Sequence, residues 1–129
     1  MKTFSRILFA FSALLLVFGA WIHTSAFGRV SAAVARSDLP AFFGKGFRVL
    51  WLQDSALQII FAIVFGILAI RPAAAPKWIV IMLALLLLTT VALVYYFIGN
   101  FIAGHLILVA AVAAILGALL NRTQSAAGD

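Results

Sequence analysis

One acidic side chain, Asp54, lies inside an apolar stretch of the chain, with Gln53, Ser55 and Gln58 close to it in sequence. The hydrophobic run that contains Asp54 continues to Ile70 and is long enough to cross a membrane. An ionisable group at membrane depth costs about 3 kcal/mol or more, so it normally faces a partner, a water-filled cavity or a bundle interior. We therefore expect Asp54 and Gln58, together with Tyr96 near the end of the third apolar run, to couple to a proton or to a ligand.

Two histidines are candidates for cofactor binding. His23 lies about one turn before the end of the first apolar run, and His105 lies about one turn after the start of the last. Neutral imidazoles could hold a haem iron or another metal, and helix bundles host such sites between facing helices. His23 and His105 are thus predicted cofactor or metal ligands. Asp54 or a tyrosine such as Tyr96 would be an outer acceptor that orients an imidazole.

Structural roles explain the same residues equally simply. An intramembrane histidine is more often a hydrogen-bonded contact between helices than a ligand. His105 also points away from the Ala/Gly face of its helix. Tyr95 and Tyr96 are typical of the aromatic belt at a membrane surface, as are the three tryptophans. Asp54 is therefore the candidate with the strongest argument for function.

The composition is that of a membrane protein. Hydrophobic residues make up 67% of the 129 residues and charged residues only 9%, against roughly 45–50% and about 25% in soluble domains. The net charge of +6 is explained by Lys and Arg flanking membrane segments, so a nucleic-acid partner is not expected. The absence of cysteine excludes disulfides and thiolate metal sites.

Four apolar runs are long enough to span a bilayer, at about 7–27, 49–70, 78–98 and 101–120. The first follows a basic start, as in a signal peptide, but its twenty or so residues favour a retained helix. Residues 28–47 are expected to form a loop in the membrane interface, and 121–129 a polar tail. Within the loop, Ser37 and Asp38 could cap a helix, and Pro40 fits a first helical turn.

These runs predict a single all-α domain, an integral membrane antiparallel four-helix bundle. In an up-down-up-down arrangement His23, Asp54, Gln58, Tyr96 and His105 all fall at one end, in a layer roughly 10 Å thick. The opposite half of the bundle has almost no polar side chain.

Small residues predict where the helices pack, because in lipid they let backbones approach closely. The first run offers Ser12, Gly19 and Ala26. The last run has a series of small residues that includes Ala110 and Gly117. Packing alone would explain nearly all of these residues.

The sequence gives only a weak signal for the orientation of the chain in the membrane. With the N-terminus inside, the inner face carries five basic residues and the outer face four. We expect a bacterial-type inner membrane protein with a cytoplasmic N-terminus, because the first helix and its basic flank usually dominate. The near balance leaves dual topology open.

Three functional hypotheses follow. The first is a small protein that binds a haem, a metal or a small amphiphile, as a subunit or accessory of a larger membrane assembly. The second is a proton-coupled transporter that works as an oligomer around Asp54, and the third is a purely structural subunit. In size the chain is similar to the small multidrug transporters, which carry a membrane-embedded Glu, whereas this chain has no Glu. Motifs for hydrolysis or phosphoryl transfer are lacking, so a non-enzymatic role is favoured.

Overall fold

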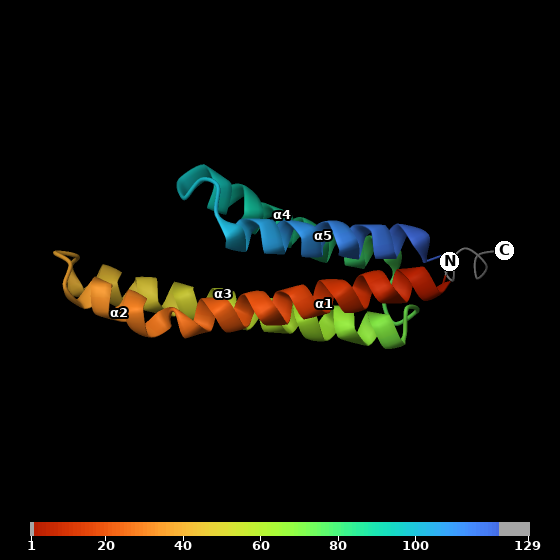
Figure 1. The fold of residues 1–129 in the computed structure, drawn as a ribbon, viewed down its shortest axis with the longest axis horizontal. Helices are drawn as coiled ribbons and strands as arrows, with labels where there is room; N and C mark the ends of the chain where they lie inside the picture. Colours follow the sequence, from red (N-terminus) through yellow and green to blue (C-terminus); the bar gives the residue numbers. More distant parts are fainter. Residues whose placement is uncertain (1, 122–129) are drawn as a thin grey trace.

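The computed structural model describes residues 2–121, and within that range it contains helices and no strands. Five helices follow one another along the chain: α1 (Lys2–Ser25), α2 (Phe27–Ala35), α3 (Ala41–Ile70), α4 (Lys77–Phe97) and α5 (Ile102–Leu120). They form an antiparallel bundle (Figure 1), so the predicted fold class is confirmed. The predicted polar tail lies outside the described residues, apart from Asn121.

The first two helices form one almost continuous rod. The Ala26 N–H donates to the Ile22 carbonyl, and the Val30 N–H donates to the Ala26 carbonyl, so backbone bonding continues across the break between α1 and α2. The resulting apolar segment, Thr3–Ala35, is 33 residues long. The bundle therefore has four helical segments that are long and apolar enough to cross a membrane.

Residues 28–47, expected to be a loop, are largely helical. The helix α2 covers the first part of this segment, α3 begins at Ala41, and only 36–40 lie outside helices. Neither Ser37 nor Asp38 caps α3. The N-cap is Pro40, without a side-chain hydrogen bond, and the Ser37 hydroxyl donates back to the Val34 carbonyl. The fixed φ of proline suits the start of a helix. Pro40 therefore occupies the cap position that Ser37 or Asp38 was expected to occupy.

The four segments form two hairpins of unequal length. The 33-residue rod of α1 and α2 pairs with α3, which has 30 residues, whereas α4 and α5 have 21 and 19. At 1.5 Å per residue the long hairpin reaches about 45–50 Å and the short one about 30 Å. In Figure 1 the α2 end of the long hairpin extends beyond the turn that joins α4 to α5.

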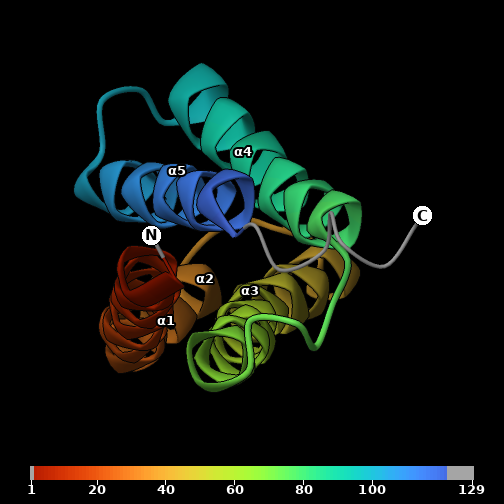
Figure 2. The ribbon, with the colours of Figure 1, turned by 90° about the vertical axis from the view of Figure 1, so that its right-hand side faces the viewer.

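The two hairpins are joined mainly by α1 and α5. Figure 2 shows α5 beside α1, with α4 on the outer side of α5 and turned away from α3 along its length. Direct backbone contact is extensive between α1 and α3 and between α1 and α5, but slight between α3 and α4. Side chains therefore decide whether the space between α3 and the short hairpin is filled.

Two serines join α1 to α5 at a regular interval. The Ser5 hydroxyl donates to the Gly117 carbonyl at 2.6 Å, and the Ser12 hydroxyl donates to the Ala110 carbonyl at 2.8 Å. Both serines are fully buried. The donors and the acceptors are each seven residues apart in antiparallel register, which is the repeat of a close helix–helix seam. Ser12, Ala110 and Gly117, which the sequence offers as packing residues of their own spans, lie together in this seam.

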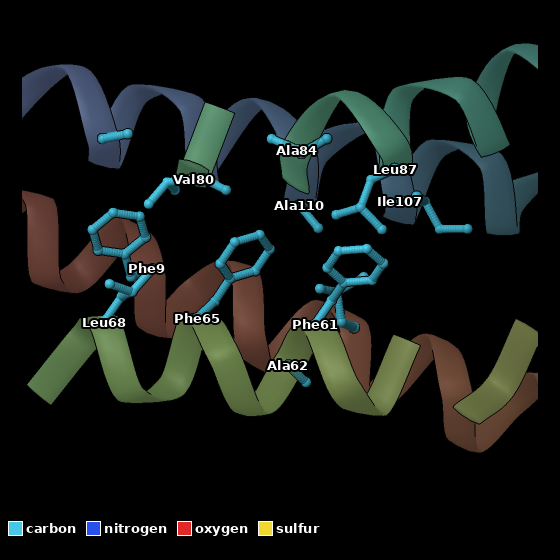
Figure 3. Packing of buried hydrophobic residues seen from close by; sticks show 14 of the residues in the cluster. Phe9, Phe61, Ala62, Phe65, Leu68, Val80, Ala84, Leu87, Ile107 and Ala110 are labelled. Atoms are coloured by element: carbon cyan, nitrogen blue, oxygen red, sulfur yellow. The ribbon is translucent and has the colours of Figure 1, made fainter. Parts of the chain in front are cut away.

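Aromatic side chains fill the half of the bundle nearest the connection 71–76. Phe61 and Phe65 rise from α3 toward α4 and α5 (Figure 3), and Phe65 stacks with both Phe61 and Phe9. Val80 and Ala84 of α4 close this cluster from the other side. We call this region the closed half. Its rings belong to one buried cluster with small and branched residues of the opposite hairpin.

Polar contacts close the same end of the molecule. The Asn121 amide donates to the Pro72 carbonyl at 2.7 Å, and the Arg6 guanidinium donates to the carbonyl of Ile70, the last residue of α3. These bonds hold the ends of three helices together. The opposite end has a short turn in which Gly99 adopts a φ of 88°, a conformation that favours glycine.

Candidate functional site

One stripe of α3 faces the short hairpin along its whole length. Its members are separated by alternating steps of three and four residues, the spacing of one helix face. They are Leu68, Phe65, Phe61, Gln58, Asp54, Trp51 and Phe47. The stripe is apolar in the closed half, and its first polar residue is Gln58. The change from apolar to polar side chains therefore falls near the middle of the bundle.

A cavity of about 380 Å³ begins where the stripe becomes polar. All four spans line it, through residues such as Gly19 of α1, Gln58 of α3, Thr90 of α4 and Leu106 of α5. Nearly all of the lining is apolar. Several residues of the rim, such as Ile98, are also exposed on the outside of the molecule, so the cavity opens to the surface at the end away from 71–76. We call this region the open half.

His23 is held against α3 by four contacts. Its ring stacks on the Trp51 indole with centroids 4.0 Å apart, and the Trp51 Nε1–H donates to the His23 carbonyl at 2.9 Å. Its Nδ1 lies 2.9 Å from the Ser55 hydroxyl and 3.7 Å from Asp54 Oδ2. The imidazole is therefore fixed in orientation on the cavity wall, with Nδ1 turned toward α3.

Asp54 and Gln58 form one hydrogen-bonded unit a single turn apart. The Gln58 Nε2–H donates to Asp54 Oδ2 at 2.7 Å. The Asp54 side chain is 33% exposed, whereas Gln58 is only 4% exposed. The Gln58 Oε1 is buried and has no hydrogen-bond partner. Because a carboxylate only accepts hydrogen bonds, the amide must present its nitrogen to Asp54, and this orientation leaves Oε1 turned away from it.

Gly19 makes room for the glutamine. A Cβ atom at Gly19 would lie 2.6 Å from Gln58 Oε1. The next pair in the seven-residue register of Ser5 with Gly117 and Ser12 with Ala110 is Gly19 with Ala103, and both of these residues line the cavity. The same small-residue seam that closes one half therefore leaves space for a polar group in the other.

A second polar pair lies within the short hairpin. The Tyr95 hydroxyl is 3.2 Å from His105 Nδ1, which also lies 3.0 Å from the Phe101 carbonyl. The Tyr95 ring packs over Gly104, where an added Cβ would lie 2.7 Å from a ring carbon. His105 is exposed and does not line the cavity. Its contacts are those of a residue that stabilises the α4–α5 hairpin.

The predicted polar layer is thus divided between the hairpins. His23, Asp54 and Gln58 come together on the long hairpin and face the cavity, while Tyr95 and His105 pair on the short one. Tyr96 is 81% exposed and contacts Phe97, so it joins neither group. The two imidazoles share no hydrogen-bond partner, and in residues 2–121 no three His, Asp or Glu side chains converge as a metal site would require.

Sequence reasoning missed two members of the site. Trp51 was interpreted as a belt residue, but it supports the His23 ring. Thr90 was not singled out, although it lines the cavity, with its hydroxyl donating to the Leu86 carbonyl at 3.4 Å. The spacing of Trp51, Asp54 and Gln58 on one helix face is the signal that could have identified the tryptophan.

Comparisons of the chain with protein-family models, with curated proteins and with solved structures give no match.

Proposed function

We propose that the chain is a small multi-pass membrane protein that binds a small amphiphilic molecule in the cavity between its two hairpins. The observation that carries the proposal is the cavity itself, an apolar chamber of about 380 Å³ with one cluster of polar side chains on its wall. Ligand sites are typically chambers of about 300–1,000 Å³, lined by apolar groups and a few placed polar groups. An amphiphile matches both parts of this wall.

The cavity is enclosed by a single chain. Because all four spans contribute to its wall, the site needs no second copy to be complete. The exposed outer faces of the helices are rich in Leu, Ile, Val and Phe, as expected for contact with lipid or with other membrane subunits. We place the protein in a bacterial-type inner membrane with a cytoplasmic N-terminus, a proposal that rests on the basic flank of the first helix.

Trp51 provides a native reporter for binding. The chain has three tryptophans, of which Trp51 lines the cavity while Trp21 and Trp78 are exposed. A protein with Trp21→Phe and Trp78→Phe reports on the cavity. A protein with Trp21→Phe and Trp51→Phe reports on partition into the detergent. The probes are three dodecyl amphiphiles labelled with a nitroxide quencher, which differ only in an ammonium, hydroxyl or carboxylate head.

Binding predicts saturable quenching of Trp51 by at least one probe, and only linear, unsaturated quenching of Trp78. Thr90→Phe should fill the cavity and abolish saturation. The neighbouring Thr89→Phe is the matched control, because Thr89 is exposed and also donates to the carbonyl four residues before it. Absence of saturable quenching with all three probes would refute the proposed function.

A second candidate is proton-coupled transport, favoured by one observation. Two titratable groups, Asp54 and His23, lie 3.7 Å apart on the cavity wall and could exchange a proton as a ligand enters. Uptake into proteoliposomes under an imposed pH gradient tests this role. Asp54→Asn should abolish the response to the gradient, and an unchanged response would exclude it.

Ligation of haem or another metal by His23 and His105 stays a prediction. A UV–visible spectrum and elemental analysis of the same purified sample test it directly. A haem band that His23→Ala and His105→Ala both remove would replace amphiphile binding as the leading function. A featureless spectrum without stoichiometric metal would remove the ligation hypothesis.

A further inference from the structure

We infer that the amphiphile bound in the cavity carries a hydrogen-bond-donating cationic head, a lipophilic ammonium, and that Asp54 and Gln58 accept its hydrogen bonds. The inference rests on the proposed function and names the chemical class of its ligand. It depends on which polar atoms of the wall already have partners and which do not.

The side-chain donor atoms of Trp51, Gln58 and Thr90 each already make one hydrogen bond. The Trp51 Nε1–H bonds the His23 carbonyl, the Gln58 Nε2–H bonds Asp54, and the Thr90 hydroxyl bonds the Leu86 carbonyl. Ser55 pairs with His23 through its hydroxyl and does not line the cavity. A ligand whose head only accepts hydrogen bonds, such as a quinone carbonyl, a carboxylate or a phosphate, would have to compete with these bonds or use the second N–H of the Gln58 amide.

Two acceptors, in contrast, lack a donor. The Gln58 Oε1 is buried without a partner, and no described residue donates to Asp54 Oδ1. A buried acceptor without a donor is costly, so a ligand that supplies an N–H or O–H is stabilised at this point.

Charge selects an ammonium over a hydroxyl. Among residues 2–121, His23 is the one basic side chain within ion-pair distance of Asp54. Arg48 lies six residues earlier on α3, but its guanidinium donates to the Ser31 carbonyl of α2 and does not line the cavity. A carboxylate without a fixed cation in a largely apolar chamber favours a cationic ligand, since charged hydrogen bonds are roughly twice as strong as neutral ones.

The three labelled dodecyl probes test this inference. We expect the ammonium probe to bind at least roughly tenfold more tightly than the hydroxyl probe, and the carboxylate probe to bind most weakly. Asp54→Asn should reduce the affinity for the ammonium probe to that for the hydroxyl probe. Asp38→Asn is the matched control, because it removes the same charge from the exposed connection between α2 and α3.

Gln58→Met keeps the length of the side chain and leaves Asp54 in place, so it tests the inference if Asp54→Asn does not fold. It should weaken both the ammonium and the hydroxyl probe by roughly two- to tenfold, because it removes the free acceptor. Gln53→Met, at an exposed position of the same helix, should change neither affinity.

Competition distinguishes two sources of the ammonium. If dodecylamine displaces the labelled ammonium probe and lysophosphatidylethanolamine does not, the ligand is a free amine. Displacement also by lysophosphatidylethanolamine indicates a lipid headgroup, and both results support the inference. Saturable binding in which the carboxylate probe equals the ammonium probe would overturn the inference while leaving the proposed function intact. An ammonium preference unchanged by Asp54→Asn would also overturn it.

Discussion

The two halves of α3 face the same short hairpin, but one half is packed and the other is hollow. In the closed half, Phe61 and Phe65 fill the space between α3 and the backbones of α4 and α5. In the open half, the equivalent positions carry Gln58, Asp54 and Trp51, and a cavity takes the place of the rings. The comparison separates the residues that hold the hairpins together from those that are available for a ligand.

The polar contacts differ in the same way. In the closed half Ser5 and Ser12 pair directly with backbone carbonyls of the opposite hairpin. In the open half, the hydrogen bonds that join His23, Trp51, Asp54 and Gln58 to one another and to Ser55 stay within the long hairpin. A polar group that crosses between hairpins stabilises their packing, whereas one that does not leaves the cavity free to open or to bind.

The largest expected contrast comes from one substitution made in both halves. Phe65→Ala should lower the free energy of unfolding by about 3–5 kcal/mol, because it opens a cavity at a fully buried ring. Phe47→Ala, on the same stripe at the rim of the cavity, should cost less than about 1 kcal/mol. Both values can be measured by reversible SDS titration in mixed micelles, followed by circular dichroism. Equal losses would mean that the two halves are packed alike.

Two glycines on the α1–α5 seam sharpen the comparison. A Cβ at Gly117 would lie 3.0 Å from the Phe9 ring, so Gly117→Val should destabilise the fold by about 1–3 kcal/mol. At Gly19 the obstacle is the Gln58 amide, the end of a flexible side chain beside a cavity. Gly19→Val should therefore leave stability within about 1 kcal/mol and weaken binding of the ammonium probe by roughly two- to tenfold.

Unfolding and probe titration on the same samples separate these two effects. The control is Gly66→Val, because a Cβ at Gly66 meets no atom within 4 Å. If Gly19→Val proved as destabilising as Gly117→Val, the open half would have no more tolerance for added atoms than the closed half.

The smallest effects are expected from the two serines. Ser5→Ala and Ser12→Ala should each lower the free energy of unfolding by about 0.6 kcal/mol, the average for hydrogen bonds between membrane helices. Their separation of seven residues predicts nearly additive losses in the double variant. Ser25→Ala is the control, because its hydroxyl donates within its own helix to the Ile22 carbonyl. Loss of probe binding in Ser12→Ala without loss of stability would contradict a purely packing role.

Hydropathy and helix periodicity account for how much of the fold could be predicted. The four spans and the short turns between the last three follow from composition, because few polar residues interrupt the runs. The helical character of 28–47 could not be predicted, since Arg29, Arg36 and Lys45 made that segment resemble a surface connection. In the structure, α2 continues the line of α1, and the residues from Ala41 onward form the start of α3. Together they form the stem of a longer hairpin.

The sequence predicts the depth at which the site residues lie along their helices, but not the direction in which their side chains point. The heights of His23 and Asp54 along their helices place them at one level, and the structure brings them within 3.7 Å. His105 has a similar height, yet its ring lies against Tyr95 in the other hairpin. The height of a residue follows from counting positions along its helix. The rotation of α5 depends on Ala110 and Gly117 packing against α1, which is far away in sequence.

The unequal lengths of the hairpins mean that no single bilayer matches both of them. A hydrocarbon core about 30 Å thick fits α4 and α5, whereas α3 and the α1–α2 rod exceed it by about 15 Å and must tilt or protrude. Changes in bilayer thickness therefore act differently on the two hairpins. Because the buried aromatic cluster joins the hairpins in the closed half, we expect a change in bilayer thickness to alter the width of the cavity mouth more than the packing around Phe65.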